Sequence, residues 1–220
     1  MPSATGNPGS SIRKRLADAQ LYVLLDGQPT ESAFCELAQS LIRAGVHMVQ
    51  LRDKTLCDRD LLGRACLLRA LTRSTGTLFI VNDRPDIARL AEADGVHLGQ
   101  DDLPVSAARA IMGPQPLVGV STHSMPQATR AVRDGADYVG CGPTFPSRTK
   151  TFAAFPGLDF LRQVSGEIEL PAFAIGGISS ENLGQVIEAG FRRVAVSSAV
   201  SRAGDPAAEA TRLLLRLQAA

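Results

Sequence analysis

Short apolar runs recur at nearly even spacing along the whole chain, with longer and more polar segments between them. Each run has the length of a strand and is almost continuous in Val, Ile and Leu, without alternating polar positions. This pattern is typical of parallel strands that are covered on both faces. It predicts eight strands, at Leu21–Leu25, Met48–Leu51, Leu78–Val81, Gly95–Leu98, Leu117–Val120, Tyr138–Cys141, Ala172–Ile175 and Val194–Val196.

The segments between the runs have the apolar period of helices. One stripe consists of Phe34, Leu37, Ala38, Leu41 and Ile42. Its spacing of three and four residues puts these side chains on one face of a helix, where they can be buried together. The alternation of strands and helices repeats along the chain without a break in composition.

Start and stop signals of helices recur as well. Ser124 with Gln127 three residues later predicts a capping box, and Asp205 before Pro206 predicts a capped helix start. Four glycines follow helical segments and precede strands, which predicts a left-handed backbone at each. They are Gly45, Gly95, Gly135 and Gly190.

This alternation predicts an α/β fold with one parallel sheet. Eight units in 220 residues, about 27 residues each, fit a single (β/α)8 TIM barrel better than a doubly wound sheet. The doubly wound sheet stays open as the alternative, because a count of strands does not show closure. We expect residues 1–19 to form an N-terminal arm with a short helix, and residues 20–220 to form the barrel.

Composition excludes several classes of protein. With 45% hydrophobic and 20% charged residues, the chain can bury a core, so disorder is excluded as the main state. A net charge of +1 and the absence of Trp argue against a nucleic-acid surface. The sequence has no apolar stretch of the ~20 residues that span a bilayer and no secretory signal. We expect a cytoplasmic domain without nucleic-acid or membrane partners, and the sequence leaves a homo-oligomer open.

The cysteines form no C-x-x-C pair. They are Cys35, Cys57, Cys66 and Cys141. In a chain without an export signal, we expect them to be reduced and mostly buried.

Polar residues gather where the predicted strands end, which is where a barrel of this kind carries its site. The set comprises Gln50, Arg52, Asp53, Lys54, Asn82, Asp83, Arg84, Gln100, Asp101, Asp102, Ser121, Thr122 and His123. Asp83 and Asp102 follow neighbouring strands, so one Mg²⁺ ion could touch both and complete its shell with phosphate and water. The alternative is that each carboxylate caps the helix after it. We expect Asp53 and Asp101 to be solvent-facing or structural.

Other residues indicate phosphate binding. The chain has 20 Arg but only three Lys, and Lys54 and Lys150 both follow predicted strands, where a compact ammonium suits a crowded phosphate. Chance is the alternative. Gly176-Gly177 and Ser197-Ser198 follow the last two strands, the usual phosphate site of such barrels, although a glycine pair also serves tight turns.

Histidine chemistry is not indicated. His47, His97 and His123 could be imagined as a metal trio, but His47 precedes a strand and His97 lies within one. We expect them to be structural. No Ser-His-Asp or Cys-His signature is present. Residues 142–157 form either a lid or a long loop.

An ordered set of segments is similar to a known family. The segments are QLRDK (50–54), VNDRPDIA (81–88), GVHLGQDDLP (95–104), GVSTHS (119–124), VGCGPTFPSRTK (139–150), AIGGIS (174–179) and VSSAV (196–200). In this order and spacing they resemble thiamine phosphate synthases. The resemblance implies a (β/α)8 barrel that joins 4-amino-2-methyl-5-pyrimidinylmethyl diphosphate to 4-methyl-5-(2-phosphoethyl)thiazole. Diphosphate would be released in a Mg²⁺-dependent step.

The resemblance also implies roles for individual residues. The pyrimidine diphosphate would be held by Gln50, Arg52, Lys54, Asn82 and Lys150, of which the cations stabilise the leaving diphosphate. Asp83 and Asp102 would bind Mg²⁺, and Ser121 would face the pyrimidine. The thiazole phosphate would be bound by Ser147, Thr149, Gly177, Ser197 and Ser198. The family often has Thr at the position of Ser147, so the hydroxyl is retained.

Three rival functions stay open. A thiazole tautomerase shares the barrel but needs neither metal nor diphosphate, so it has no use for the cations together with the two aspartates. A non-catalytic sensor would bind thiamine phosphate without turnover. A phosphosugar isomerase would require a base, and the sequence offers none.

Overall fold

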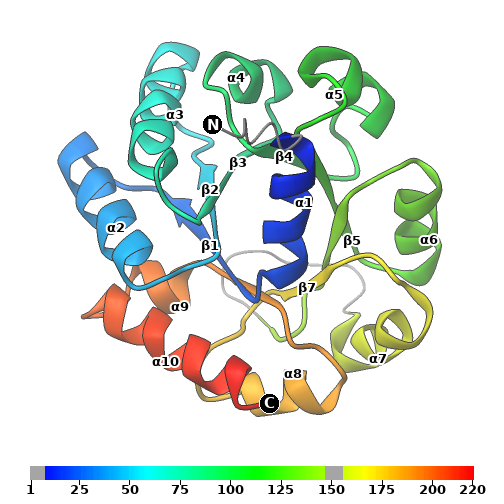
Figure 1. Ribbon diagram of the computed structural model, residues 1–220. Coiled ribbons are helices and arrows are strands. Elements are labelled where there is room, and N and C mark those ends of the chain that lie inside the picture. Colours follow the sequence, from blue (N-terminus) through cyan, green and yellow to red (C-terminus); the bar gives the residue numbers. More distant parts are fainter. Residues whose placement is uncertain (1–7, 147–155) are drawn as a thin grey trace, which may run out of the picture.

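Eight parallel strands form a closed barrel in the computed structural model, which describes residues 8–146 and 156–220. Strand β1 pairs with β2 on one side and with β8 on the other, as Leu21 lies opposite Val194. This pairing closes the ring and excludes the doubly wound alternative (Figure 1). The strands are β1 (Leu21–Asp26), β2 (Met48–Arg52), β3 (Leu78–Asn82), β4 (Gly95–Leu98), β5 (Leu117–Thr122), β6 (Tyr138–Cys141), β7 (Ala172–Ile175) and β8 (Val194–Val196).

All eight strand predictions are confirmed, and each strand begins at the predicted residue. Four strands run further than predicted, to Asp26, Arg52, Asn82 and Thr122. The backbone ladder needs no apolar side chain, so it continues into the polar residues at the carboxyl ends. Several of the chemistry-bearing residues therefore sit on strands, which hold them more rigidly than loops would.

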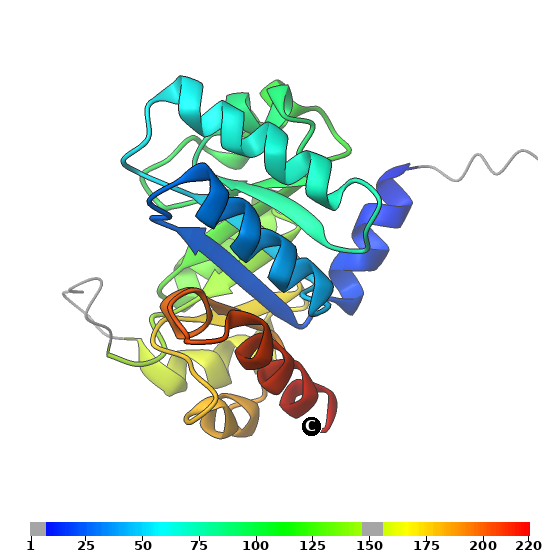
Figure 2. The ribbon, with the colours of Figure 1, turned by 90° about the vertical axis from the view of Figure 1, so that its left-hand side faces the viewer.

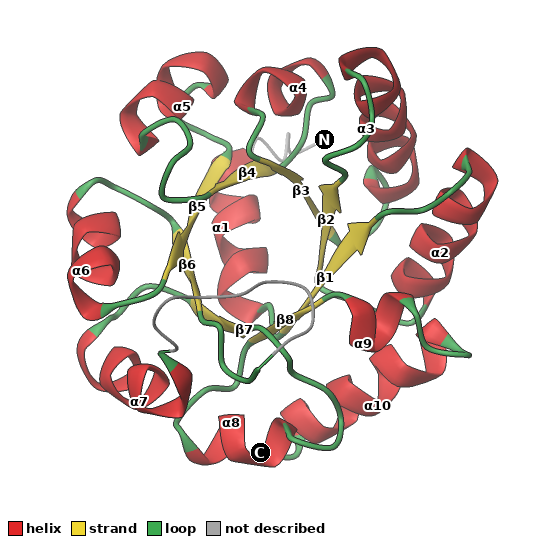
Figure 3. Cartoon of the chain, turned by 180° about the vertical axis from the view of Figure 1, so that it is seen from behind, coloured by secondary structure: helices red, strands yellow, loops and turns green. Residues whose placement is uncertain are grey.

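The helices surround the barrel, and one of them closes its amino end. Figure 3 shows the outer ring from the end opposite α1, and Figures 1 and 2 show α1 lying across the strand starts. The helices are α1 (Pro8–Asp18), α2 (Glu31–Arg43), α3 (Asp58–Thr72), α4 (Pro85–Leu90), α5 (Val105–Met112), α6 (Met125–Arg133), α7 (Gly157–Glu167), α8 (Leu183–Glu188), α9 (Ser198–Ser201) and α10 (Pro206–Gln218). No helix of the described residues is both long and apolar enough to cross a membrane.

Two apolar layers stabilise this arrangement. The outer layer lies between the strands and the surrounding helices, and the inner layer fills the barrel. Tyr22, Tyr138 and Phe173 are the large rings of the inner layer, and Leu16 of α1 packs against it from below. Two ion pairs fix α1 there, Arg13–Asp137 and Arg15–Asp94, both at 3.1 Å. The interior is thus sealed at its amino end.

The helix signals are confirmed in part. Gly45, Gly135 and Gly190 have positive φ as predicted, and Asp205 caps α10 by accepting from the Ala208 amide at 2.9 Å. The prediction for Gly95 is wrong. This glycine lies inside β4, where an added Cβ would come within 2.6 Å of the Leu117 carbonyl oxygen, so close strand packing explains it.

Two further predictions need correction. Ser124 begins α6 without a side-chain cap, because the Gln127 side chain accepts from the His123 amide at 2.7 Å instead. The capping box is therefore not formed. The cysteines are free, but they are not mostly buried: Cys141 is buried, whereas Cys57 and Cys66 are exposed at the start and on the outer face of α3.

We expect Gly119→Ala to destabilise the protein by about 1–3 kcal/mol. An added Cβ would lie 2.1 Å from the buried Tyr138 ring, which has no space to move. The matched control is Gly166→Ala on α7, where nothing lies within 4 Å and alanine favours the helix. Urea unfolding of both variants measures the difference, and equal stabilities would contradict this packing argument.

Candidate active site

A cavity of about 510 Å³ opens at the carboxyl ends of the strands. Its floor is the inner layer of the barrel, represented by Tyr22, Tyr138 and Phe173, and its walls are the polar strand ends. Of the residues predicted for the site, nine line this cavity: Gln50, Arg52, Lys54, Asn82, Asp83, Asp102, Ser121, Ser197 and Ser198. Five different strands or their following loops supply them, namely β2, β3, β4, β5 and β8, and closure of the barrel brings them together.

The remaining predicted residues are placed differently. Gly177 does not line the cavity. It follows the lining Gly176, and its carbonyl accepts from Asn182 Nδ2 at 2.8 Å. Ser147, Thr149 and Lys150 lie outside the described residues. Their roles, and the choice between lid and loop for residues 142–157, stay predictions.

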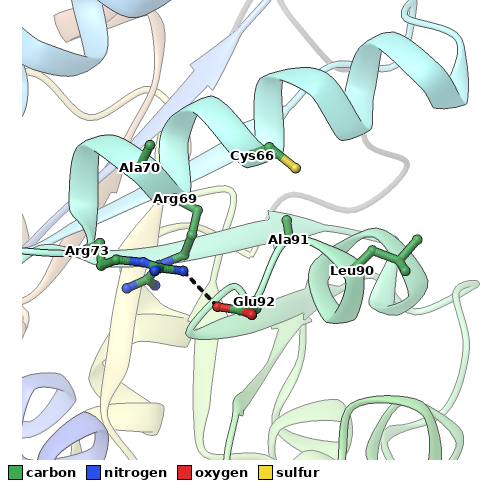
Figure 4. A pocket seen from close by; sticks show the side chains of 7 residues that line it. All are labelled: Cys66, Arg69, Ala70, Arg73, Leu90, Ala91 and Glu92. Carbon is green, nitrogen blue, oxygen red and sulfur yellow. Dashed lines mark hydrogen bonds and ion pairs between the residues drawn. The ribbon is translucent and has the colours of Figure 1, made fainter.

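A second hollow, of about 430 Å³, lies on the outer surface between α3 and α4 (Figure 4). It is lined by Cys66, Arg69, Ala70, Arg73, Leu90, Ala91 and Glu92. Both arginines are engaged in ion pairs, Arg69 with Asp94 at 3.2 Å and Arg73 with Glu92 at 2.9 Å. The charged groups of this hollow are thus paired within the protein, whereas the strand-end cavity gathers polar side chains from several strands, so the strand-end cavity is the candidate site.

Two carboxylates and an ammonium meet at the ends of β3 and β4. Lys54 Nζ lies 3.0 Å from Asp83 Oδ2, and Asp102 is near enough to both groups for each of them to shift its pKa. Asp102 also accepts from the Gly99 amide at 2.6 Å. Burial raises the pKa of Asp102, and the neighbouring Asp83 raises it further. The Lys54 ammonium lowers the same pKa, so the three charged groups act on one another at this wall of the cavity.

The helix-cap alternative for these aspartates is wrong. The N-cap positions of α4 and α5 are Arg84 and Pro104, neither of which is an aspartate. Asp83 instead has a left-handed backbone, with φ of 60°, and its amide donates to the His97 carbonyl at 2.8 Å. A non-glycine residue in this conformation is strained, and such strain is concentrated at functional sites.

The acid pair fits a Mg²⁺ ion by its chemistry. Mg²⁺ takes oxygen ligands, uses one or two protein carboxylates and fills its shell with phosphate oxygens and water. Asp83 and Asp102 supply such a pair at the cavity wall. In the described residues no group of three or more His, Cys, Asp or Glu side chains forms a closed metal site. A hard ion shared with a substrate phosphate is therefore the form of metal binding that these residues suit.

The opposite wall depends on close contact between the ends of β6 and β7. At Gly142 an added Cβ would lie 2.0 Å from the Ile175 carbonyl oxygen, and the amides of Thr144 and Phe145 donate to Ile175 and Gly176. Ser197 lies at the N-cap position of the short helix α9 beyond β8, without a side-chain cap hydrogen bond, and Arg202 at the other end of α9 also lines the cavity. Hydroxyls, backbone and a guanidinium thus surround one end of the cavity, as suits a phosphate.

A chain of hydrogen bonds crosses the barrel beneath the cavity. Gln50 Nε2 donates to Tyr22 Oη, which lies 3.2 Å from Tyr138 Oη. Tyr138 Oη lies 3.2 Å from His97 Nδ1, and His97 Nε2 lies 2.9 Å from Ser121 Oγ. Four of the five residues are buried, so their polar atoms satisfy one another away from water.

The residues for which we expect no catalytic role, namely the three histidines with Asp53 and Asp101, divide into two groups. His47 is structural, since its Nδ1 accepts from the Leu21 amide at 3.3 Å, and Asp53 pairs with buried Arg64 at 3.2 Å. His97 and His123 have satisfied hydrogen bonds but also line the cavity. Asp101 is exposed as expected and lies on the cavity rim.

Sequence reasoning missed several lining residues, chiefly Tyr22, Tyr138, Gln127 and Arg202, and it placed Gln100 at a strand end without giving it a role. The signal for the tyrosines is the alternation of strand faces, because Tyr22 shares the inward face with Leu24. Gln100 gave a weaker signal. It donates to the Ser121 carbonyl and accepts from Arg130, both at 2.6 Å, which no spacing in the sequence indicates.

We expect acid to destabilise the protein through His97. Burial lowers the pKa of His97 to about 4 in the folded protein, whereas the unfolded value is 6.5. The unfolded chain therefore takes up the proton first, so the stabilisation is full above pH 6.5 and is lost as the pH falls toward 4. Over this range the free energy of unfolding should fall by about 3 kcal/mol more in the wild type than in His97→Gln. Urea titrations at each pH measure this, and parallel profiles would refute it.

The chain is similar to known proteins over most of its length. A family model described as thiamine monophosphate synthase matches residues 21–200. The chain is 47% identical over 193 residues to a thiamine-phosphate synthase of Rhodopirellula baltica, covering 86% of this chain and 52% of that protein. It is 44% identical over 200 residues to the thiamine-phosphate synthase of Chloroflexus aurantiacus, covering 90% and 92%. The chain thus spans about half of the first relative and nearly all of the second.

A solved structure agrees with these relatives. Thiamine phosphate pyrophosphorylase from Pyrococcus furiosus superimposes with a TM-score of 0.84 at 33% identity, covering 94% of this chain and 98% of that one. A 3-hexulose-6-phosphate synthase superimposes with a TM-score of 0.67 at 23% identity, which shows the shared barrel alone.

Proposed function

The chain belongs to the thiamine monophosphate synthase family, and from this premise we propose that it is a thiamine phosphate synthase. It would join 4-amino-2-methyl-5-pyrimidinylmethyl diphosphate to 4-methyl-5-(2-phosphoethyl)thiazole and release diphosphate. The observation that carries the proposal is the contact of Lys54, Asp83 and Asp102 at the wall of one cavity. A polyanion and its counter-ions would be held there together.

Release of diphosphate is the charge-separating step. The bond between the pyrimidinylmethyl carbon and the diphosphate oxygen breaks, and both electrons leave with the oxygen. Arg52 and Lys54 line the cavity and would stabilise the charge that develops on the leaving group. Lys150 is proposed for the same role from the family resemblance. The carbon is left as a pyrimidinylmethyl cation.

Bond formation needs no strong base. The thiazole nitrogen carries a lone pair and attacks the cation directly, forming the C–N bond. The site matches this requirement, because its histidines are engaged in hydrogen bonds with Ser121, Tyr138 and Gly142. Holding both substrates at near-attack distance would supply much of the remaining rate enhancement.

Each substrate has its own part of the cavity in this proposal. Gln50, Asn82 and Ser121 would contact the pyrimidine and its diphosphate, while Ser197 and Ser198 would bind the thiazole phosphate. Ser147, Thr149 and Gly177 are proposed for the phosphate from the resemblance. Asp83 and Asp102 would hold Mg²⁺, which when bound supplies positive charge to the diphosphate oxygens.

The tautomerase alternative is disfavoured by this arrangement. An isomerase that handles no diphosphate has no use for paired carboxylates beside an ammonium, and maintaining like charges in contact costs free energy. The sensor alternative predicts binding of thiamine phosphate without turnover, so a turnover assay separates it from the synthase.

We expect Lys54→Ala to lower turnover about a hundredfold, because one charge contact to the leaving diphosphate is lost. Formation of thiamine phosphate from both substrates measures the rate. The matched control is Lys14→Ala, an exposed lysine of α1 at the other end of the barrel, which should retain full activity. A fully active Lys54→Ala variant would show that Lys54 does not contact the leaving diphosphate.

We also expect turnover to require Mg²⁺. A chelator should abolish diphosphate release, added Mg²⁺ should restore it, and Asp102→Asn should raise the Mg²⁺ concentration needed for half-maximal rate at least tenfold (about 1.4 kcal/mol). Asp159→Asn on the outer face of α7 is the control. Turnover that is indifferent to the chelator would point to the tautomerase.

A further inference from the structure

We propose that Tyr22, Tyr138 and His97 are positioning residues that fix the direction of the buried hydrogen-bond chain, so that Ser121 points its hydroxyl proton into the cavity. The inference rests on the proposed function for the identity of the ligand that receives this proton. It goes further in naming residues that act on the substrate through Ser121 and in stating which partner donates.

The direction follows from counting protons along the chain. The Gln50 amide nitrogen can only donate, so Tyr22 Oη accepts from it. Tyr22 has one hydroxyl proton, and its remaining partner is Tyr138 Oη at 3.2 Å. Tyr138 then accepts from Tyr22, and its own proton goes to His97 Nδ1 at 3.2 Å. Each phenol thus has one donor and one acceptor role.

The count continues through the histidine. A neutral imidazole carries one proton, and because Nδ1 accepts, the proton is on Nε2. His97 Nε2 lies 2.9 Å from Ser121 Oγ and therefore donates to it. Ser121 Oγ is then an acceptor toward the protein, and its hydroxyl proton is left for a group in the cavity that it lines.

Burial keeps the groups of this hydrogen-bond chain from replacing one another with water molecules as partners. Gln50, Tyr22, Tyr138 and His97 are all less than 9% exposed. Ring packing holds them further, since Tyr22 and Tyr138 both meet Phe173 edge-on, with centroids 5.6 and 5.7 Å apart. A reversed hydrogen-bond chain would need the Gln50 amide to turn around, so that its oxygen instead of its nitrogen faced Tyr22 Oη.

The consequence is a requirement on the ligand. Ser121 as donor favours a substrate with a lone pair at that point, and the ring nitrogens of an aminopyrimidine are such acceptors. Loss of these hydrogen bonds should therefore weaken recognition of the pyrimidine substrate. Recognition of the thiazole phosphate, at the other end of the cavity, should be unaffected.

The first test reads the proton directly in the wild-type protein. With ¹⁵N-labelled histidine, long-range ¹H–¹⁵N spectra distinguish the two tautomers of each of the three histidines, and the His97→Gln variant assigns the His97 signals. We expect a protonated Nε2 and a bare Nδ1. A proton on Nδ1 would overturn the direction. This measurement needs no substrate, so its failure is separate from a failure to form thiamine phosphate.

The second test is a double-mutant cycle with Tyr138→Phe and Ser121→Ala. Tyr138→Phe should lower kcat/KM for the pyrimidine diphosphate about tenfold, the effect of about one hydrogen bond, and leave KM for the thiazole phosphate unchanged. In the Ser121→Ala background the same change should have an effect below twofold. Equal losses in both backgrounds would overturn the positioning role.

If Tyr138→Phe does not fold, Tyr22→Phe replaces it in the double-mutant cycle. It removes the proton that orients Tyr138 but retains the Tyr138–His97 contact. We expect a smaller loss than in Tyr138→Phe, again confined to the pyrimidine substrate and absent in the Ser121→Ala background. A loss that persists in that background would contradict the proposal.

Discussion

The hydrogen bonds between β1 and β8 are the constraint on which the site depends. They join the first and last strands of the sheet and turn a row of strand ends into a ring. Residues far apart in sequence, such as Lys54 and Ser197, then face one cavity. In an open sheet these residues would lie at different places along an edge. The convergence of charge that the chemistry requires is therefore a product of closure.

Closure also means that polar side chains inside the barrel need hydrogen-bond partners away from water, and the hydrogen bonds from Gln50 to Ser121 supply them. A barrel of eight strands has an interior just wide enough for side chains, and water has no place among them. Polar groups can reach this interior only if each finds a partner there. Tyr22 and Tyr138 meet this condition by bonding to each other, to Gln50 and to His97. The inner layer is thus apolar in its bulk and polar along one path to the cavity floor.

The sequence was sufficient for the fold because its signals are local. Continuous apolar runs predicted every strand start, and their regular spacing favoured the barrel, whereas closure itself is shown by the pairing of β1 with β8. For the site, strand ends were enough to predict Asp83 and Asp102, but the partners of Tyr138 and Gln100 depend on side-chain directions across the ring. Local rules failed where a tertiary contact competed with them. Gln127 bonds to the His123 amide instead of completing a cap, and Gly95 is required by its neighbour Leu117.

The helix α1 has a consequence for the order of assembly. Its arginines bind Asp94 and Asp137, and the same two carboxylates accept backbone amides of Phe79 and Val118. The two aspartates, Asp94 and Asp137, lie 79 residues or more downstream of Arg15 in the sequence. Helix α1 precedes every strand in sequence, yet it can make these ion pairs only after the middle strands have formed. Closure of the amino end of the barrel by α1 is therefore a late step of folding, although α1 lies before β1 in the chain.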